Sequence, residues 1–313
     1  MHGFLLSIVI PVFNEEGNID ALLKRLQPII QPYNHEIVFV NDGSRDHTVD
    51  DIKHHAKEDK RIKLVSFYRN FGHQMALSAG YTHTHGDCVI SIDADLQDPP
   101  EIIPEMIKKW QEGAKVVYAK RKKREVDTFF KKHTAQIFYK LMNFMSDVPI
   151  PEDVGDYRLL DKSVVDFLKS LPEKPVFLRG LVAWGGFPGA TVYFEREKRY
   201  AGETHYPFKK MLNFALEGLT SFSTKPLRMA TYLGFVSAFL GFAAILYALI
   251  GKYIRPPFFP HDWVTGWTAL FVGIMFIGGI QHLTIGIIGE YIGKIYKEVQ
   301  KRPHFLIKET VNI

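Results

Sequence analysis

The sequence of 313 residues predicts an α/β fold in which a mainly parallel sheet is flanked by helices. Two observations predict it: short β-branched runs alternate with polar segments of helical length up to Lys120, and those runs are almost unbroken in their apolar character. Strands of a parallel sheet are buried on both faces, so they read as continuous hydrophobic stretches. A third observation is that polar residues end or follow each run, and such sheets bind ligands beyond the carboxyl ends of their strands.

The expected elements follow from this alternation. The strands are residues 5–12, 35–42, 63–68, 88–95 and 115–120, and the helices are about 17–30, 48–57, 73–84 and 100–112. The first run is interpreted as a buried strand rather than a signal peptide, because it lacks a basic leader and a small-residue cleavage site. The segments at the strand ends are PVFNEE, NDGSRD, RNFGH, DADLQD and KRKKRE. Polar chemistry therefore gathers at one edge of the sheet.

The composition narrows the class of protein only in part. A formal net charge of +5 suits nucleic acid, nucleotide phosphates or an anionic membrane surface equally well. Nucleic acid is not an expected partner, because the basic residues are not interleaved with an aromatic surface. The single cysteine, Cys88, excludes an intramolecular disulfide and a cysteine-based metal site, and its apolar surroundings indicate a buried, inert thiol.

Two long apolar runs predict a membrane anchor. Met229–Gly251 carries no charge, and Gly266–Gly289 is interrupted only by Gln281 and His282. About 20 helical residues cross a hydrocarbon core of ~30 Å, so both runs are expected to span the membrane. The short, proline-containing linker at 252–265 makes them a hairpin with both ends on one side.

Basic residues set the expected orientation of this hairpin. Two basic residues, Lys225 and Arg228, precede the first span. Four follow the second span: Lys294, Lys297, Lys301 and Arg302. The linker between the spans carries only Lys252 and Arg255. By the positive-inside rule the remainder of the chain and both termini face the cytoplasm. Apolar residues at helical spacing after Tyr206 predict an amphipathic helix lying in the headgroup plane. A packing helix of the soluble domain is the alternative for that segment. The expected divisions of the chain are the α/β domain at 1–205, the amphipathic helix at 206–226, the two spans at 227–290 and a cytoplasmic C-terminal tail at 291–313.

The strongest chemical signal is the pair Asp93 and Asp95, directly after a buried strand. Two carboxylates so spaced at a strand end can converge on one hard cation, which then bridges the oxygens of a diphosphate. The alternative is an acidic turn before a helix that starts at Asp98-Pro99-Pro100. If the pair does bind a cation, that cation neutralises the charge that grows on a departing nucleoside diphosphate.

These segments together resemble family 2 glycosyltransferases of the polyprenyl-phosphate group, which includes dolichol-phosphate mannose synthases and bactoprenol glucosyltransferases. The matching stretches are SIVIPVFNEEGNI, IVFVNDGSRDHT, RNFGHQMALSAG, DADLQDPPE, GDYR, RYAGETHYP and GEYIGKIY, in order along nearly the whole chain. The resemblance implies a catalytic GT-A fold, a nucleoside-diphosphate-sugar donor, Mg²⁺ or Mn²⁺, and a lipid phosphate acceptor. It also implies that a homo-oligomer, with a tetramer as one form, is possible.

The resemblance assigns roles to individual residues. The nucleoside and diphosphate positions are Pro11, Asn14, Glu15, Glu16, Asp42, Asp93 and Arg199; the metal positions are Asp93, Asp95 and Gln97. An ordinary helix cap at Asn-Glu-Glu and an ordinary turn at Asn-Asp-Gly are the alternatives for the first group. The segment after Arg199 departs from the family pattern, because Thr204-His205 replaces the usual Ser-Lys, which leaves the role of His205 open.

Three further residues are expected near the acceptor. Asp156 matches the family's general base, although a lipid phosphate is already ionised near neutral pH, so electrostatic positioning is the stronger role; an Asx turn is the alternative. The basic run 120–124 lies in the family's acceptor region, and Arg121 and Lys132 are assigned to the acceptor phosphate. Attraction to an anionic membrane is the alternative for this run.

The expected reaction is an inverting, single displacement that moves a hexose to polyprenyl (undecaprenyl) phosphate, with Asp95 and Asp156 as catalytic residues. UDP-glucose is the favoured donor, and UDP-N-acetylglucosamine, GDP-mannose and a modified arabinose stay open. A bacterial inner membrane is the favoured location. A processive polysaccharide synthase is disfavoured by the lack of a Q-x-x-R-W motif and of further spans. The alternative from another class is a non-catalytic membrane scaffold that keeps the fold.

Overall fold

The computed structural model describes residues 3–122, 154–172, 178–195, 224–253 and 266–313. The chain forms two compact units. The first unit comprises Met1–Asn143, Val148–Met211 and Arg302–Ile313, and the second comprises Phe144–Asp147 and Leu212–Lys301. Several expected features lie outside the described residues: Lys132, Arg199, His205, the greater part of the 206–226 segment and most of the 252–265 linker.

The first unit is built on one eight-stranded sheet in the order β7-β5-β6-β4-β1-β2-β3-β8. The strands are β1 Leu5–Val12, β2 Asn34–Asn41, β3 Ile62–Phe67, β4 Cys88–Ser91, β5 Val116–Arg121, β6 Val154–Asp161, β7 Gly189–Phe194 and β8 Ile307–Val311. The sheet is mixed: β4, β1, β2 and β3 are parallel, whereas β6 and β8 run antiparallel to their neighbours. The expected parallel character therefore holds for the centre of the sheet and not for these two strands.

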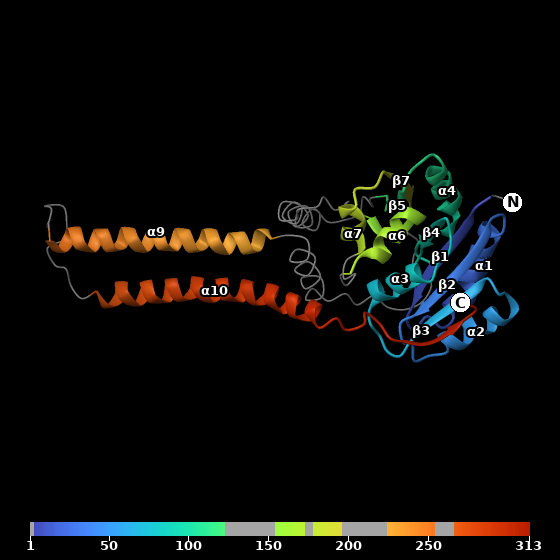
Figure 1. Ribbon diagram of the computed structural model, residues 1–313, viewed down its shortest axis with the longest axis horizontal. Helices are drawn as coiled ribbons and strands as arrows, with labels where there is room; N and C mark the ends of the chain where they lie inside the picture. Colours follow the sequence, from blue (N-terminus) through green and yellow to red (C-terminus); the bar gives the residue numbers. More distant parts are fainter. Residues whose placement is uncertain (1–2, 123–153, 173–177, 196–223, 254–265) are drawn as a thin grey trace. The chain divides into compact units, whose positions relative to one another are not determined.

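Helices cover both faces of this sheet (Figure 1). They are α1 Asn18–Ile30, α2 Thr48–Glu58, α3 His73–Thr82, the 3-10 turn η1 Pro100–Ile102, α4 Ile103–Gln111, α6 Lys162–Ser170 and α7 Leu178–Trp184. Alternate residues of a strand face opposite sides. On one side, Ile8 and Phe39 share a core with α1, α2 and α4; on the other, Val38 and Val40 pack with α3.

The antiparallel direction of β6 brings its first residues to the functional edge of the sheet. Ser91, the last residue of β4, is opposite Arg158, and Lys120 of β5 is opposite Val154. The carboxyl ends of β4 and β5 therefore meet the start of β6, which carries Asp156. No strand was expected at this segment, because the charged pair Asp156 and Arg158 interrupts its apolar pattern.

The C-terminal residues form β8 and close the sheet edge beside β3. Glu309 of β8 is paired with Lys53 of α2 at 2.8 Å. The Asn312 side-chain amide donates to the carbonyl oxygens of Ala56 and Ile62 at 2.8 and 2.9 Å. The Phe305 ring stacks on Phe67 with centroids 4.9 Å apart. A segment expected only as a cytoplasmic tail is thus part of the sheet, and it covers what would be an unpaired edge.

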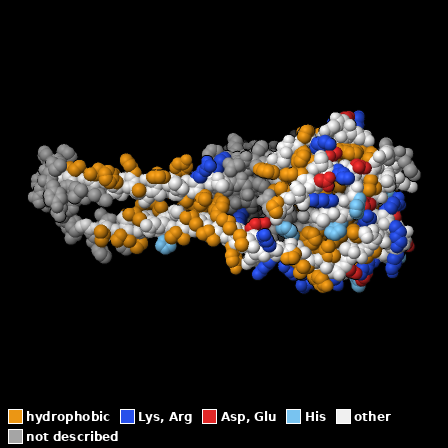
Figure 2. Space-filling view, in the orientation of Figure 1, with side chains coloured by type: hydrophobic (Ala, Val, Ile, Leu, Met, Phe, Trp, Pro, Cys, Tyr) orange, Lys and Arg blue, Asp and Glu red, His pale blue; other side chains and the backbone are white. Residues whose placement is uncertain are grey.

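In the second unit the described residues form two long helices, α9 Lys225–Tyr253 and α10 Trp267–Val299, which contact each other. Their described large apolar side chains are widely exposed, as the hydrophobic atoms along both helices show in Figure 2. Within the described residues, Val272–Val299 is long and apolar enough to cross a membrane, and Leu227–Ala243 is a shorter apolar stretch. Exposed apolar surface of this extent indicates a membrane or protein partner.

Candidate active site

The site lies at the carboxyl edge of the sheet, and its first wall is made by the ends of β1 and β2. The backbone N–H of Asp42 donates to the Val12 carbonyl at 2.9 Å. The Asn14 N–H donates to Ser44 Oγ at 2.9 Å, and Asn14 Oδ1 accepts the Arg45 N–H at 3.0 Å. The structure therefore brings the Asn-Glu-Glu segment beside the Asn-Asp-Gly segment, as the sequence predicts for successive strand ends.

The remaining residues of this wall are held in the same way. The Glu15 N–H donates to Thr48 Oγ1 at 2.9 Å, and Glu16 Oε2 accepts the His47 N–H at 3.2 Å. Pro11 lies within β1 and is buried. These contacts fix the loop at the end of β1 onto the start of α2.

Asp42 links this wall to the loop after β3. Its two carboxylate oxygens accept the backbone N–H groups of Phe71 and Gly72 at 2.6 and 2.9 Å. Burial raises the pKa of Asp42, and the two N–H donors partly offset that effect. The contacts position the start of α3, whose first residue is His73.

The expected metal pair follows β4. Asp95 is buried, and its Oδ1 accepts the Gln97 N–H at 3.1 Å. The intervening turn is anchored by buried Ala94 and Leu96. Leu96 has φ +59°, a left-handed conformation that non-glycine residues seldom adopt. Backbone strain of this kind is often found at functional sites, where the surrounding structure maintains it.

The chemistry of this turn fits a hard divalent cation. Burial raises the pKa of Asp93, and the nearby charges of Asp156 and Asp95 add to that effect while His73 opposes it. A cation would relieve this crowding of negative charge. No cluster of three or more His, Cys, Asp or Glu side chains suited to a metal occurs in the part of the chain that the structure describes. A cation at Asp93 and Asp95 would therefore need diphosphate oxygens and water, which is the usual mode for Mg²⁺.

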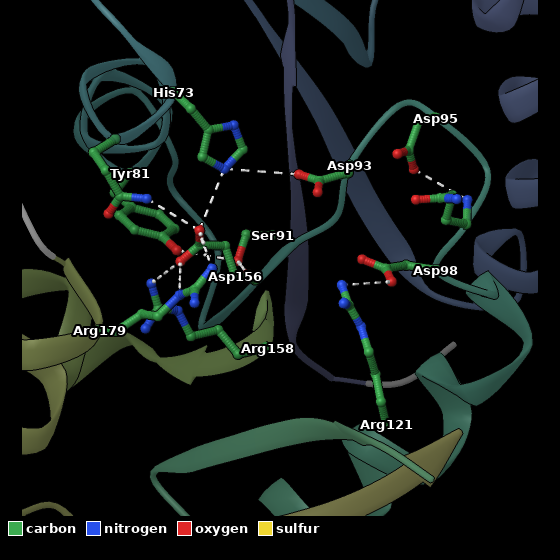
Figure 3. A network of polar contacts seen from close by, with 12 residues as sticks. His73, Tyr81, Ser91, Asp93, Asp95, Asp98, Arg121, Asp156, Arg158 and Arg179 are labelled. Atoms are coloured by element: carbon green, nitrogen blue, oxygen red, sulfur yellow. Dashed lines mark hydrogen bonds and ion pairs between the residues drawn. The ribbon is translucent and has the colours of Figure 1, made fainter. Parts of the chain in front are cut away.

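Asp156 is the centre of a polar network beside this turn (Figure 3). Its carboxylate accepts hydrogen bonds from Gln74 Nε2 at 3.0 Å, Arg158 Nη2 at 3.1 Å, and Arg179 Nε and Nη2 at 3.1 and 3.0 Å. His73 Nε2 lies 3.4 Å from Asp156 Oδ2 and 3.8 Å from Asp93 Oδ1. His73 thus connects the expected metal pair with the expected base.

The network determines the charge of Asp156. Burial alone would raise its pKa, but His73, Arg179 and Arg158 outweigh that cost and hold the pKa well below its ordinary value. Burial likewise disfavours the charged form of His73, yet Asp156 and Asp93 raise its pKa. Asp156 is therefore a stable carboxylate that orients donors, and it is poorly suited to accept a proton.

Four members of this network were not singled out from the sequence: His73, Gln74, Arg158 and Arg179. The position of His73 and Gln74 directly after RNFG, at a strand end, could have indicated the first two. Arg158 stands two residues after Asp156, a spacing that puts both side chains on one face of a strand. Nothing in the local sequence distinguishes Arg179.

Arg121 stands at the end of β5, on the other flank of the acidic turn. Its Nη2 lies 4.0 Å from Asp98 Oδ1. The neighbouring Lys122 Nζ lies 3.6 Å from Glu195 Oε1. The structure thus places Arg121 near the Asp93–Asp98 segment.

The carboxylate pair after β4 and the ion-paired carboxylate at the start of β6 lie together at the carboxyl edge of an α/β sheet, where folds of this class bind their ligands. The chain belongs to glycosyltransferase family 2, whose model matches residues 7–168. It is 45% identical over 307 residues to the SfII prophage-derived bactoprenol glucosyl transferase of Shigella flexneri, covering 97% of this chain and 98% of that protein. It is 47% identical over 309 residues to the uncharacterized glycosyltransferase YkcC of Bacillus subtilis, covering 98% and 94%.

Solved structures agree on the fold. Glucosyl-3-phosphoglycerate synthase of Mycobacterium tuberculosis matches with a TM-score of 0.50 and 21% identity, covering 70% of this chain and 79% of that one. The same enzyme in complex with Mg²⁺ and UDP matches with a TM-score of 0.50 and 18% identity, covering 70% and 78%.

Proposed function

We propose that this chain transfers a hexose, glucose in the first instance, from a nucleoside diphosphate sugar to polyprenyl (undecaprenyl) phosphate with inversion. The observation that carries this proposal is the position of Asp93, which directly precedes the turn that holds Asp95 and whose Oδ1 lies 3.8 Å from His73 Nε2 of the Asp156 network. A diphosphate site and an anion site thus adjoin. The bactoprenol glucosyl transferases that are 45% identical over nearly the whole chain support the acceptor and the sugar.

In this proposal Asp93 and Asp95, with Gln97, would hold Mg²⁺ or Mn²⁺, and the bound cation would supply positive charge for the leaving nucleoside diphosphate. Asn14, Glu15, Glu16, Pro11 and Asp42 form the nucleoside end. The solved synthase in complex with Mg²⁺ and UDP supports a cation together with a nucleotide.

The remaining assignments concern the acceptor. Arg121 and Lys132 contact the lipid phosphate, and Arg199 closes over the donor diphosphate. Asp156 keeps its neighbours in place rather than removing a proton, since the lipid phosphate reaches the site ionised. Catalysis then consists of positioning and charge stabilisation.

The second unit anchors the enzyme. We propose that α9 and α10 form a transmembrane hairpin, with 206–226 at the interface and the catalytic domain and both termini in the cytoplasm of a bacterial cell. The exposed apolar side chains of both helices support this. A tetramer is the oligomer proposed.

The test is transfer itself. Purified protein in detergent, polyprenyl phosphate, Mg²⁺ or Mn²⁺ and a panel of UDP-glucose, UDP-N-acetylglucosamine and GDP-mannose are incubated, and the lipid product is identified by mass spectrometry. We expect glucosyl-phosphoryl-polyprenol from UDP-glucose and loss of product on chelation with EDTA. Asp95→Ala should abolish turnover, whereas Asp50→Ala, an exposed carboxylate of α2, should not.

The alternatives predict different results. Product from another donor would correct the sugar and leave the reaction class intact. A scaffold that only keeps the fold would give neither lipid product nor slow donor hydrolysis with any nucleotide sugar. Full activity of folded Asp95→Ala would remove the metal assignment.

A further inference from the structure

Asp98 is the third carboxylate of the acidic segment after β4, following Asp93 and Asp95. The sequence suggests it as the start of a helix, but the residue that caps η1 is Pro99, one position further on. Asp98 is 4% exposed, so its charge is largely removed from water. Burying a carboxylate is costly unless cations or hydrogen-bond donors surround it. The groups beside Asp98 therefore indicate its role.

A group of opposite charge beside Asp98 is the guanidinium of Arg121, at the end of β5. Nη2 of Arg121 lies 4.0 Å from Asp98 Oδ1, a distance at which the charges attract but which is too long for a hydrogen bond. Figure 3 shows the Arg121 side chain directed toward Asp98. The Arg121 side chain is 38% exposed, so a ligand can reach it. Asp98 thus attracts the guanidinium without taking a hydrogen bond from its Nη2.

A second arginine–carboxylate pair in the same region shows the contrast. Arg25 of α1 meets Glu101 of η1 through Nε at 2.6 Å and Nη2 at 2.8 Å. A paired contact of this kind uses two donors of the guanidinium at once. Arg121 makes no such contact with Asp98, and its Nε is buried without a hydrogen-bond partner among the described residues. Arg121 is therefore held by charge and keeps hydrogen-bonding capacity for a ligand.

The backbone next to Asp98 is held by β6. Tyr157 is buried, and its hydroxyl donates to the Pro99 carbonyl at 2.9 Å. A Cβ on Gly155 would lie 3.8 Å from Arg121 Nη2, so the guanidinium lies against the backbone of the same strand. Asp98 and Arg121 therefore meet beside β6, and the carboxylate side of the pair is fixed by the sheet.

We propose that Asp98 is a positioning residue for the acceptor, which holds the guanidinium of Arg121 in the orientation that receives the phosphate of the lipid. This inference rests on the proposed function, in which Arg121 contacts that phosphate, and adds a residue to it. Asp98 itself touches neither substrate. Because Asp93 and Asp95 serve the donor in the same proposal, one short segment then acts on both substrates.

Removing the charge of Asp98 has two opposite effects. A guanidinium that is no longer held takes other orientations, and misplacing a reacting group by about 1 Å can lower the rate on the order of 10²-fold. Removing a negative charge near an anionic substrate favours its binding, but one screened charge at a half-exposed site changes affinity by about fivefold or less. The loss of positioning therefore outweighs the gain in attraction, and activity toward the lipid falls.

The experiment is a double-mutant cycle on the full chain in detergent, with polyprenyl phosphate, the nucleotide sugar and Mg²⁺. In Asp98→Asn we expect kcat/KM for polyprenyl phosphate to fall about tenfold. The KM for the nucleotide sugar and the Mg²⁺ concentration for half-maximal rate should each stay within about twofold. When Arg121→Gln is already present, Asp98→Asn should cause no further loss, because its effect passes through Arg121.

The matched control is Glu101→Gln, which breaks the paired contact with Arg25 three residues after Asp98. All three quantities should stay within about twofold of the wild-type values in this variant, because the Arg25 contact is exposed and is not part of the proposed site. If Asp98→Asn does not fold, Asp98→Ser takes its place in the cycle with the same criteria.

Three results in an active wild type overturn this inference alone. The first is an unchanged kcat/KM for the lipid in Asp98→Asn, or an equal loss with and without Arg121→Gln. The second is a rise in kcat/KM in both backgrounds, which would make Asp98 only a repelling charge. The third is a raised nucleotide-sugar KM or Mg²⁺ requirement, which would place Asp98 at the donor. A wild type that transfers no sugar to polyprenyl phosphate overturns the proposed function and this inference with it.

Discussion

The carboxylate of Asp42 accepts the backbone N–H of Gly72 at 2.9 Å, so the end of β2 holds the first turn of α3. His73 follows Gly72 directly and reaches both Asp93 and Asp156. Asp42 is therefore connected to the reacting region through one residue of backbone. A residue assigned to nucleotide binding also shapes the site.

Asp42→Asn should lower both stability and activity. An amide offers one acceptor oxygen, so one of the N–H groups of Phe71 and Gly72 loses its partner, which costs about 1–3 kcal/mol when buried. The unfolding midpoint in detergent should fall by several degrees, and kcat/KM should fall because His73 is less well placed. An unchanged midpoint would show that the loop does not depend on Asp42.

Gly43→Ala should be more damaging than Gly17→Ala. Both glycines have positive φ, +74° and +82°. A Cβ on Gly43 would collide with the carbonyl carbon of Arg69, whereas a Cβ on Gly17 meets nothing within 4 Å. We expect a loss of about 1 kcal/mol at Gly17, from backbone conformation alone, and clearly more at Gly43. Equal losses of thermal stability would contradict the close approach of the two loops.

The sequence predicts those strands and helices whose buried residues form a recognisable pattern within a few consecutive positions. Unbroken apolar runs identify β1 to β5, and the helices after β1 to β4 follow from the spacing of apolar residues. β6 could not be found in this way, because the neutralisation of Arg158 by Asp156 is visible only in three dimensions. β8, with the sequence IKETV, has no regular apolar pattern and buries little of its surface, and its pairing with β3 joins residues about 240 positions apart.

The candidate site shows the same division. Asp93, Asp95, Asp42 and Asn14 stand at strand ends, where the sheet's direction alone brings them together. Arg179 comes from α7, and its contact with Asp156 depends on how α7 packs beyond the sheet, which no strand rule determines. Contacts that depend on the packing of elements far apart in the sequence, such as Arg179 with Asp156, could therefore not be predicted.

Asp161 should make stability depend on pH. Burial opposes its ionisation, but donors from Ser163, Trp110 and Lys115 lower its pKa from 3.8 to about 2. A carboxylate with a lowered pKa stabilises the fold fully above 3.8 and loses that contribution as the pH falls towards 2. At pH 6 the contribution is about 2 kcal/mol. The midpoint difference between wild type and Asp161→Asn should shrink from pH 6 to pH 2.5; a constant difference would contradict it.

Phe305→Ala should loosen the loop after β3. Phe305 stacks on Phe67, which meets Phe71 edge-on with centroids 5.7 Å apart. Loss of a half-buried ring should cost about 2 kcal/mol and lower kcat/KM, because this loop leads to His73. Leu306→Ala is the control: its side chain is 53% exposed, so its effect should stay within about 0.5 kcal/mol. Similar losses in both variants would mean that the ring stack is not what supports the loop.

Asp156→Asn should affect folding and turnover by separable routes. Arg158 is 0% exposed, so removing the Asp156 charge leaves a buried guanidinium without its counter-ion, a loss of about 3–5 kcal/mol. Arg158→Met in the same chain removes that buried charge and should recover much of the thermal stability. Turnover should remain low in the double variant, because Arg179 still lacks the carboxylate that fixes both of its donors. Measuring midpoints and kcat/KM for the two single variants and the double variant tests this. If stability and turnover recover together, Asp156 serves only to neutralise Arg158, and its part in orienting Arg179 is wrong.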